Sequence, residues 1–111
     1  MFNSIDHIEI VTQNMKESVE FYTNILGFKM KSSFKPRMRV SSLAGSRARK
    51  IVYLTLGDTT LELLEFPKAG PIPSQPHVGY RMMAVTVDDM HAAIEYLRKH
   101  GVTISREPIN L

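Results

Sequence analysis

An internal repeat restricts the fold of this chain more than any other feature of its sequence. A shift of 75 residues aligns residues 7–22 with residues 82–97 without a gap. Dropping one residue then aligns Gly27 with Gly101, so that a strand pattern, a helix cap, an apolar helical stripe and a closing glycine recur in the same order. Because each of these features must agree independently, their recurrence indicates two copies of one building block.

The first copy, residues 4–66, has the order strand, helix, strand, strand, strand. Alternating residues and flanking turn residues predict strands at 4–12, 28–35, 50–56 and 59–66. Asn14 is predicted to cap a helix that ends at Gly27, and Gly57-Asp58 is predicted to form the turn of a hairpin. The apolar stripe of the helix comprises Met15, Val19, Tyr22 and Leu26. These elements predict a βαβββ module of the α+β class.

The second copy follows a proline-rich linker and stops early. Residues 67–79 form the linker, because four of the six prolines fall there and proline cannot pair inside a sheet. The copy itself, residues 80–111, predicts a strand at 82–87, a helix capped by Asp88 or Asp89, and the start of a strand at 102–106. We therefore expect a single domain over residues 1–111 whose second module is incomplete. An unfinished module leaves an open sheet edge, which indicates either a truncated chain or a partner that completes the sheet.

The composition narrows the chemistry that the chain can perform. It has no cysteine, which excludes disulfides, thiolate ligands and thiol nucleophiles and favours the cytoplasm. The apolar runs are short and the N-terminus lacks the pattern of a signal peptide, so no membrane span is expected. Eight of the 14 lysines and arginines fall between Lys29 and Lys50, with no acid among them. Phe34 is the only aromatic residue of this basic segment and no nucleic-acid-binding motif surrounds it, so nucleic acid is not an expected partner.

Three stretches carry a resemblance to a known family, namely IDHIEIVTQNMKESVEFYTNILGFKM, LGDTTLELLEFP and GYRMMAVTVDDMHAAIEYLRKHGV. They resemble the vicinal oxygen chelate superfamily, which includes glyoxalase I, bleomycin-resistance proteins and ring-cleaving dioxygenases. The resemblance covers most of the chain outside the basic segment and the linker. It implies paired βαβββ modules that curl into a cup, and a homodimer, because half-cups in this superfamily are commonly shared between chains.

The resemblance also implies a divalent ion inside the cup, Ni, Co, Zn or Mn, with one ligand from the first strand and one from the fourth strand of each module. In the first module these metal ligands would be His7 and Glu62. Strand alternation places His7 on the same face as Glu9, and Glu62 on the same face as Leu64. The plainer alternatives are a hydrogen-bonded strand histidine and a solvent-facing carboxylate.

The second module departs from this pattern. The shift of 75 residues places Met82 where glyoxalase-like members carry a second histidine, and a thioether is a poor ligand for these ions. The fourth ligand would lie beyond Leu111, which leaves two protein ligands where catalytic zinc sites use three. Glu9 or His77 is an alternative donor. The predicted substrate pocket is lined by Glu9, Leu64, Met82 and Ala84.

The resemblance implies two main functions. The first is a metal-dependent lyase or isomerase of glyoxalase type, in which the ion binds the vicinal oxygens of a small substrate. Its catalytic base would be Glu62, Glu9 or a carboxylate beyond the C-terminus. The second is a metal-free small-molecule-binding protein like the bleomycin-resistance members, which accounts better for Met82. A third is a structural subunit whose open edge pairs with another chain. The basic segment is expected to be a loop at the mouth of the cup that attracts an anionic substrate.

Overall fold

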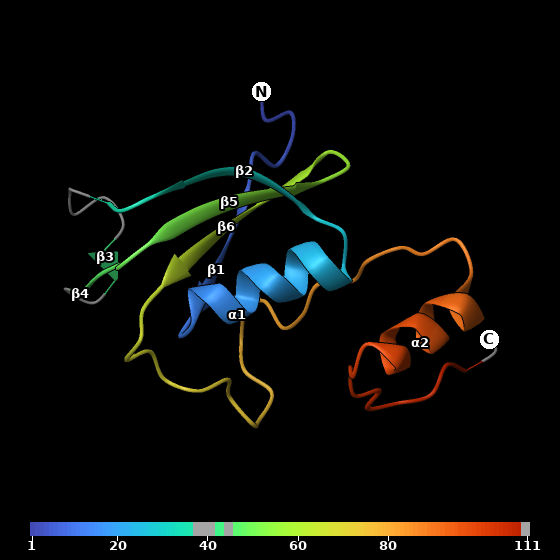
Figure 1. Cartoon of the computed structure of the whole chain (residues 1–111). Coiled ribbons are helices and arrows are strands. Elements are labelled where there is room, and N and C mark those ends of the chain that lie inside the picture. Colours follow the sequence, from blue (N-terminus) through green and yellow to red (C-terminus); the bar gives the residue numbers. More distant parts are fainter. Residues whose placement is uncertain (37–41, 44–45, 110–111) are drawn as a thin grey trace. The chain divides into compact units, whose positions relative to one another are not determined.

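The computed structural model describes residues 1–36, 42–43 and 46–109 of the chain (Figure 1). The chain divides into two compact units, which we call unit 1 (Met1–Pro71) and unit 2 (Ile72–Leu111). Each unit is considered by itself below. None of the helices in the described ranges combines the length and apolar character that crossing a bilayer requires.

Unit 1 contains a four-stranded mixed sheet. Its strands are β1 (Ile8–Thr12), β2 (Lys29–Phe34), β5 (Ile51–Leu56) and β6 (Thr59–Glu65), in the spatial order β1-β6-β5-β2. The edge strand β1 runs parallel to β6, whereas β6 to β5 and β5 to β2 are antiparallel pairs. The hairpin between β5 and β6 turns at Gly57, whose φ of 56° is a conformation that glycine adopts without strain. All four predicted strands of the first copy are therefore confirmed, and the first is shorter than predicted.

The helical segment between β1 and β2 begins and ends where the sequence predicts. The Asn14 side chain accepts a 3.1 Å hydrogen bond from the backbone N–H of Glu17, which caps α1 (Met15–Glu20). The segment continues as a π-helical turn, η1 (Phe21–Ile25), and ends before Gly27, whose φ is 81°. Thr23 donates its hydroxyl to the carbonyl of Val19 inside this turn. The π-turn was not predicted from the sequence.

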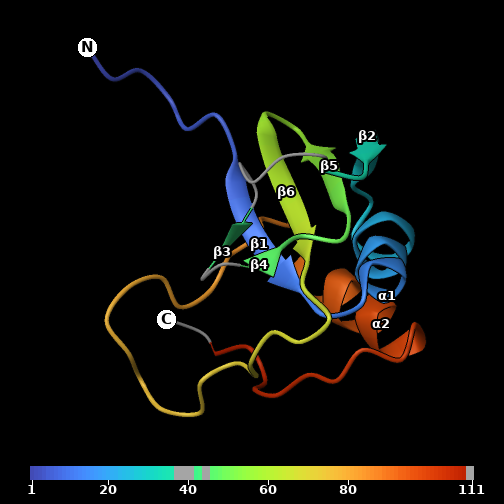
Figure 2. The same ribbon diagram turned by 90° about the vertical axis from the view of Figure 1, so that its left-hand side faces the viewer.

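The two faces of the sheet have different surroundings. On the face covered by α1, which we call the α1 face, the buried core comprises Met15, Phe28, Val52, Leu54, Leu61 and Leu63. The predicted helical stripe packs against this core, and Figure 2 shows α1 on one side of the sheet. The opposite face, which we call the Glu62 face, has a smaller buried cluster of Ala48, Ile51, Leu64 and Phe66. Because side chains alternate along β6, Leu63 and Leu64 belong to different cores.

Between β2 and β5, the basic segment contains two short strands that the sequence did not predict. These are β3 (Ser42–Leu43) and β4 (Ser46–Arg47), which form a two-stranded antiparallel pair. Arg37 and Arg39 of the basic segment lie outside the described residues.

Unit 2 confirms the predicted helix of the second copy and contradicts its strands. The helix α2 (Met90–Lys99) is capped by Asp89, whose carboxylate accepts a 3.0 Å hydrogen bond from Ala92 N–H. Residues 82–87 and 102–106, predicted as strands, form none in the described chain. A strand requires a neighbour for its backbone hydrogen bonds, and the described part of unit 2 contains no strand that could pair with either segment. The alternation of residues in these two segments was therefore not sufficient to form a paired strand.

Candidate functional site

His7 and Glu62 lie together on the Glu62 face of unit 1. The Nε2 atom of His7 is 3.2 Å from Oε2 of Glu62, and the two side chains are 34% and 9% exposed. The parallel pairing of β1 with β6 explains this proximity, because it places Glu9 directly beside Glu62. His7 precedes Glu9 by two residues and so lies on the same face, immediately before β1 begins.

Asp6 holds the other nitrogen of the His7 ring. Nδ1 of His7 is 2.7 Å from Oδ2 of Asp6. This hydrogen bond, assisted by the nearby Glu62 and Glu9 carboxylates, raises the pKa of His7, although partial desolvation opposes the shift. The same contact lowers the pKa of Asp6. A carboxylate on Nδ1 fixes the ring orientation and leaves Nε2 directed toward Glu62.

Tyr53 is a third member of the group, which the sequence analysis missed. Its hydroxyl donates a 2.9 Å hydrogen bond to Oε1 of Glu62, so that both carboxylate oxygens have a partner. Burial raises the pKa of Tyr53, as do its bond to Glu62 and the nearby acids, so the hydroxyl keeps its proton. The ring meets that of His7 edge-on and stacks with Phe34. The predicted turn at Gly57-Asp58 was the available signal, because it fixes the hairpin register that pairs Tyr53 with Glu62.

The four residues predicted to line a substrate pocket have different surroundings. Glu9 lies beside Glu62 and is exposed. Leu64 lies on the same face but is only 1% exposed, because Ile51 and its neighbours cover it. Met82 and Ala84 belong to unit 2, where both are exposed and neither is part of a strand. Within unit 1, only Glu9 of these four is both accessible and adjacent to Glu62.

Comparison with known proteins identifies the family. The model of the Glyoxalase/Bleomycin resistance protein/Dioxygenase superfamily matches residues 4–110. The chain belongs to this superfamily. The resemblance carried by the three sequence stretches is confirmed, as is the α+β glyoxalase-like fold.

Several members of the superfamily show how far the similarity extends. The uncharacterized protein YaeR of Escherichia coli K12 is 34% identical over 99 residues, covering 88% of this chain and 71% of YaeR. A glyoxalase family protein from Enterococcus faecalis matches with a TM-score of 0.75 and 25% identity, covering 90% of this chain and 74% of that chain.

Two more distant members share the fold alone. The trypanothione-dependent glyoxalase I of Leishmania major matches with a TM-score of 0.68 and 23% identity, covering 97% of this chain and 73% of that chain. A mutant of FosX, a fosfomycin resistance protein from Listeria monocytogenes, was solved with Mn(II) and 1S,2S-dihydroxypropylphosphonic acid. It matches with a TM-score of 0.68 and 14% identity, covering 100% of this chain and 79% of that chain.

The superfamily implies a divalent ion, and the His7–Glu62 pair fits part of its ligand set. An imidazole nitrogen and a carboxylate oxygen 3.2 Å apart have about the separation of two ligands that each lie ~2.1 Å from one ion. Among the residues that the structure describes, no three His, Cys, Asp or Glu side chains are grouped closely enough to hold a metal. The described chain therefore offers two suitable donors, and a metal site built on them would require further donors.

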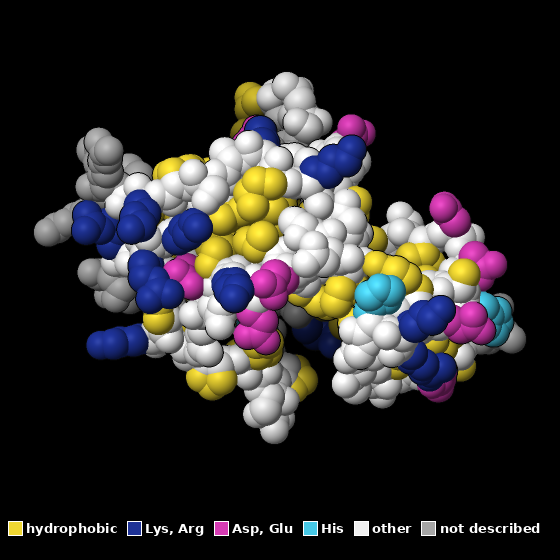
Figure 3. Space-filling model, in the orientation of Figure 1, with side chains coloured by type: hydrophobic (Ala, Val, Ile, Leu, Met, Phe, Trp, Pro, Cys, Tyr) yellow, Lys and Arg dark blue, Asp and Glu magenta, His cyan; other side chains and the backbone are white. Residues whose placement is uncertain are grey.

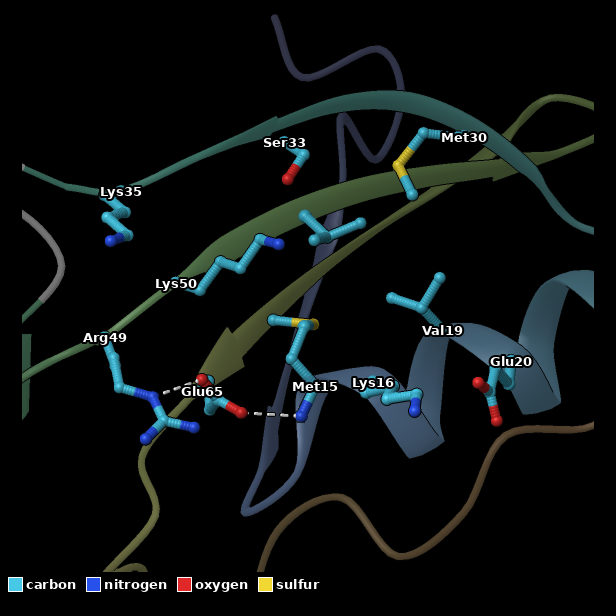
Figure 4. A pocket seen from close by; sticks show the side chains of 11 residues that line it. Met15, Lys16, Val19, Glu20, Met30, Ser33, Lys35, Arg49, Lys50 and Glu65 are labelled. Atoms are coloured by element: carbon cyan, nitrogen blue, oxygen red, sulfur yellow. Dashed lines mark hydrogen bonds and ion pairs between the residues drawn. The ribbon is translucent and has the colours of Figure 1, made fainter.

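Three residues of the basic segment lie on the side of the sheet opposite the predicted metal ligands. Lys35, Arg49 and Lys50 line a pocket on the α1 face, the side of the sheet opposite Glu62 (Figure 4). Strand alternation accounts for this placement, because Phe34 and Ile51 face the Glu62 side and their sequence neighbours Lys35 and Lys50 face the other. The predicted loop at the mouth of the cup stays a prediction, because residues 37–41 and 44–45 of the basic segment lie outside the described residues.

Proposed function

We propose that the chain is a metal-dependent lyase or isomerase of the glyoxalase type, acting on a small substrate with adjacent oxygens. The observation that carries this proposal is the contact between His7 Nε2 and Glu62 Oε2 at 3.2 Å on one face of the sheet. Imidazole and carboxylate are ligands that suit divalent nickel, cobalt, zinc and manganese. The Mn(II) complex of the distant FosX and the glyoxalase I fold supply the analogy.

Each residue of the group has a defined part in this proposal. His7 and Glu62 would hold the ion, Asp6 would orient the His7 ring, and Tyr53 would orient the Glu62 carboxylate. The bound ion would polarise the substrate carbonyl and stabilise the charge that develops on its oxygen. Glu62, or the exposed neighbouring Glu9, would remove the proton beside that carbonyl.

We further propose that a homodimer completes the site. The strands β1 and β2 are the outer strands of the described sheet, so each has one edge without a partner strand. The segment before α2 exposes large apolar side chains, among them Val78, Tyr80, Met82 and Val85. Exposed apolar residues in a segment without regular secondary structure are suited to contact with a second copy. Light scattering on the purified full chain should give twice the 12.6 kDa chain mass. A monomeric mass at micromolar concentration would contradict this part of the proposal.

Metal titration of the full chain tests the ligand assignment. Chelator-stripped protein should bind Mn²⁺ or Ni²⁺ in calorimetry at a pH above the raised pKa of His7, where Nε2 is free of its proton. Asp6→Asn should weaken binding by roughly tenfold as an outer-shell change, and His7→Ala should weaken it more. His91→Ala, which removes an exposed histidine of unit 2, is the matched control and should leave binding unchanged. Equal affinities for His7→Ala and the unsubstituted chain would overturn the assignment.

Deuterium exchange tests the reaction class. The metal-loaded protein should exchange the proton beside the carbonyl of small α-hydroxy ketones with D₂O, and Glu62→Gln should abolish the exchange. Retention of exchange in Glu62→Gln together with its loss in Glu9→Gln would assign the base to Glu9 instead of Glu62. Metal binding without any exchange across such a panel would contradict lyase or isomerase chemistry.

A metal-free binding protein is the second candidate function. It is favoured by the lack, within the described ranges, of any group of three potential metal ligands. In this case the Glu62 face would bind a small molecule through Tyr53, Phe34 and Glu9. Absence of binding to all four divalent ions, together with ligand-induced changes in these side chains, would support this candidate over the enzyme.

A further inference from the structure

We propose that unit 1 has a second binding site, on the α1 face, for a small organic anion with a short apolar portion. The site is the pocket between α1, the start of β5 and β2, which we call the α1-face pocket. Its volume of about 660 Å³ lies within the range of small-molecule sites. Because it lies on the other side of the sheet from Glu62, it is separate from the proposed metal site.

The floor of the α1-face pocket is apolar. Met15 and Val19 of α1 and Met30 and Val52 of the sheet line it. Figure 4 shows the Met30 and Val19 side chains directed into the same hollow, and Figure 3 shows an apolar patch between α1 and β2. The patch is exposed because α1 packs over β6 and leaves β2, at the sheet edge, less covered. Met30 of β2 is 50% exposed. Displacing water from this surface would favour binding of a hydrocarbon group.

One end of the pocket carries an excess of positive charge. Lys35 and Lys50 lie at the end away from Met30, and Lys16 lies on the α1 side (Figure 4). No ion pair involves any of these three ammonium groups within the described residues. Three cations without an ion-pair partner around a hollow attract an anion by an amount that falls as salt concentration rises.

The other charged groups of the pocket leave this excess largely intact. Arg49 Nε is 2.7 Å from Oε1 of Glu65, so these two charges compensate each other. The second oxygen of Glu65 accepts a 2.7 Å hydrogen bond from the backbone N–H of Met15, which fixes the start of α1 against β6. Glu20 is the remaining acid in the lining. Lys16, Lys35 and Lys50 therefore exceed the free carboxylates by two charges.

The separation of charge and apolar surface defines the class of ligand. A phosphate or carboxylate head would lie near Lys35 and Lys50, and a short alkyl or aryl group would lie over Met30 and Val19. Lysine binds phosphate as a point charge without the geometric demand of a guanidinium fork. The site should therefore accept either anionic head and discriminate mainly by charge and by the apolar group.

Methionine methyl NMR on the full chain tests the proposal with hexyl phosphate as the probe. The Met15 and Met30 methyl signals should shift on titration, whereas that of Met1, which belongs to the same unit and does not line the pocket, serves as an internal reference. Raising the salt from about 20 to about 200 mM should weaken binding several-fold. Inorganic phosphate and 1-hexanol, which each carry half of the required chemistry, should each bind roughly tenfold more weakly.

Charge reversal at the cationic end provides the matched comparison. Lys35→Glu/Lys50→Glu should weaken hexyl phosphate binding by roughly tenfold or more. Lys29→Glu/Lys68→Glu makes the same change in net charge away from the pocket and should bind as the unsubstituted chain does. Equal affinities for the two double variants, or equal affinities for hexyl phosphate and 1-hexanol, would overturn the proposal. Binding to phosphatidylglycerol vesicles without binding to monomeric hexyl phosphate would also overturn it, in favour of a membrane surface.

The two proposed sites can be tested independently of each other. Glu62→Gln alters the proposed metal site and should leave the response of the Met15 and Met30 methyl signals unchanged. The Lys35→Glu/Lys50→Glu variant should in turn keep its metal affinity. Loss of both kinds of binding in either variant would contradict the inference that two sites lie on opposite faces of one sheet.

Discussion

The two copies of the repeat have similar local sequence patterns and reach different structures. Residues 7–22 form a strand and a capped helix that pack into a sheet, whereas residues 82–97 form a capped helix preceded by a segment without regular secondary structure. The difference arises from the segments that come after each helix. The first helix precedes three strands that pair with one another and with β1, and the second precedes none in the described chain. Periodicity thus specifies a helix locally, but a strand forms only where a neighbour supplies hydrogen bonds.

Truncation of an apolar side chain should give the largest difference in stability between the two copies. Leu54 is fully buried between α1 and the sheet, so Leu54→Ala should lower the free energy of unfolding of unit 1 by about 3 kcal/mol. Ile94→Ala removes a partly buried residue of α2 and should cost about 1 kcal/mol or less. Native-state hydrogen exchange on the full chain measures both values. If the two substitutions had equal costs, unit 2 would contain a core as well packed as that of unit 1.

Acidification should weaken unit 1 through Glu65. The hydrogen bond from Arg49 lowers the pKa of Glu65 below its usual 4.5, assisted by the Met15 N–H and opposed by burial. The ionised form therefore stabilises the folded state above pH 4.5, and this contribution is lost as the pH falls through the lowered pKa. Glu65→Gln should cost about 1 kcal/mol at neutral pH, a small value because Arg49 is largely exposed and solvent-screened.

The comparison of Glu65→Gln with the unsubstituted chain also depends on pH in a defined direction. The difference in unfolding free energy should be full at pH 7 and should shrink as the pH falls through the lowered pKa of Glu65, as urea denaturation at several pH values would show. Glu17→Gln, which removes an exposed acid of α1 and keeps the Asn14 cap, is the control. A difference that grows on acidification would show that the protonated form of Glu65 is the one favoured by folding.

Local signals in the sequence predicted most of unit 1. The Asn14 cap, the stripe from Met15 to Leu26 and the Gly57 turn are each recognisable from residues close together in the sequence, and all three predictions are confirmed. The strand at 82–87 was predicted from alternation and from the internal repeat, and the structure has no strand there, because strand pairing is a tertiary property.

The candidate site was only partly predictable for the same reason. Strand alternation predicted which face of its own strand His7 and Glu62 each occupy. Their 3.2 Å contact depends on the parallel pairing of β1 with β6, which no local pattern specifies. Tyr53 lies opposite Glu62 through the hairpin register, and a tyrosine in a strand has no local feature that marks it as the partner of a carboxylate on the next strand. The lysines near the helix required knowledge of the face on which α1 packs. Their roles in binding stay predictions.

The two helix caps offer the finest comparison between the copies, because they are matched in geometry. Asn14 and Asp89 each accept one hydrogen bond from the backbone N–H three residues later, at 3.1 and 3.0 Å. Replacing either cap by alanine should cost about 1 kcal/mol. In Asn14→Ala the cost should reach β5 and β6, because Met15 and Val19 pack directly on the sheet core, and amide exchange in those strands should accelerate roughly fivefold. In Asp89→Ala the acceleration should stay within α2, since a ten-residue helix without a described strand in its own unit unfolds on its own. Thr23→Ala, outside both caps, is the control, and faster exchange of β5 and β6 amides in Asp89→Ala would show that the second helix is coupled to the sheet after all.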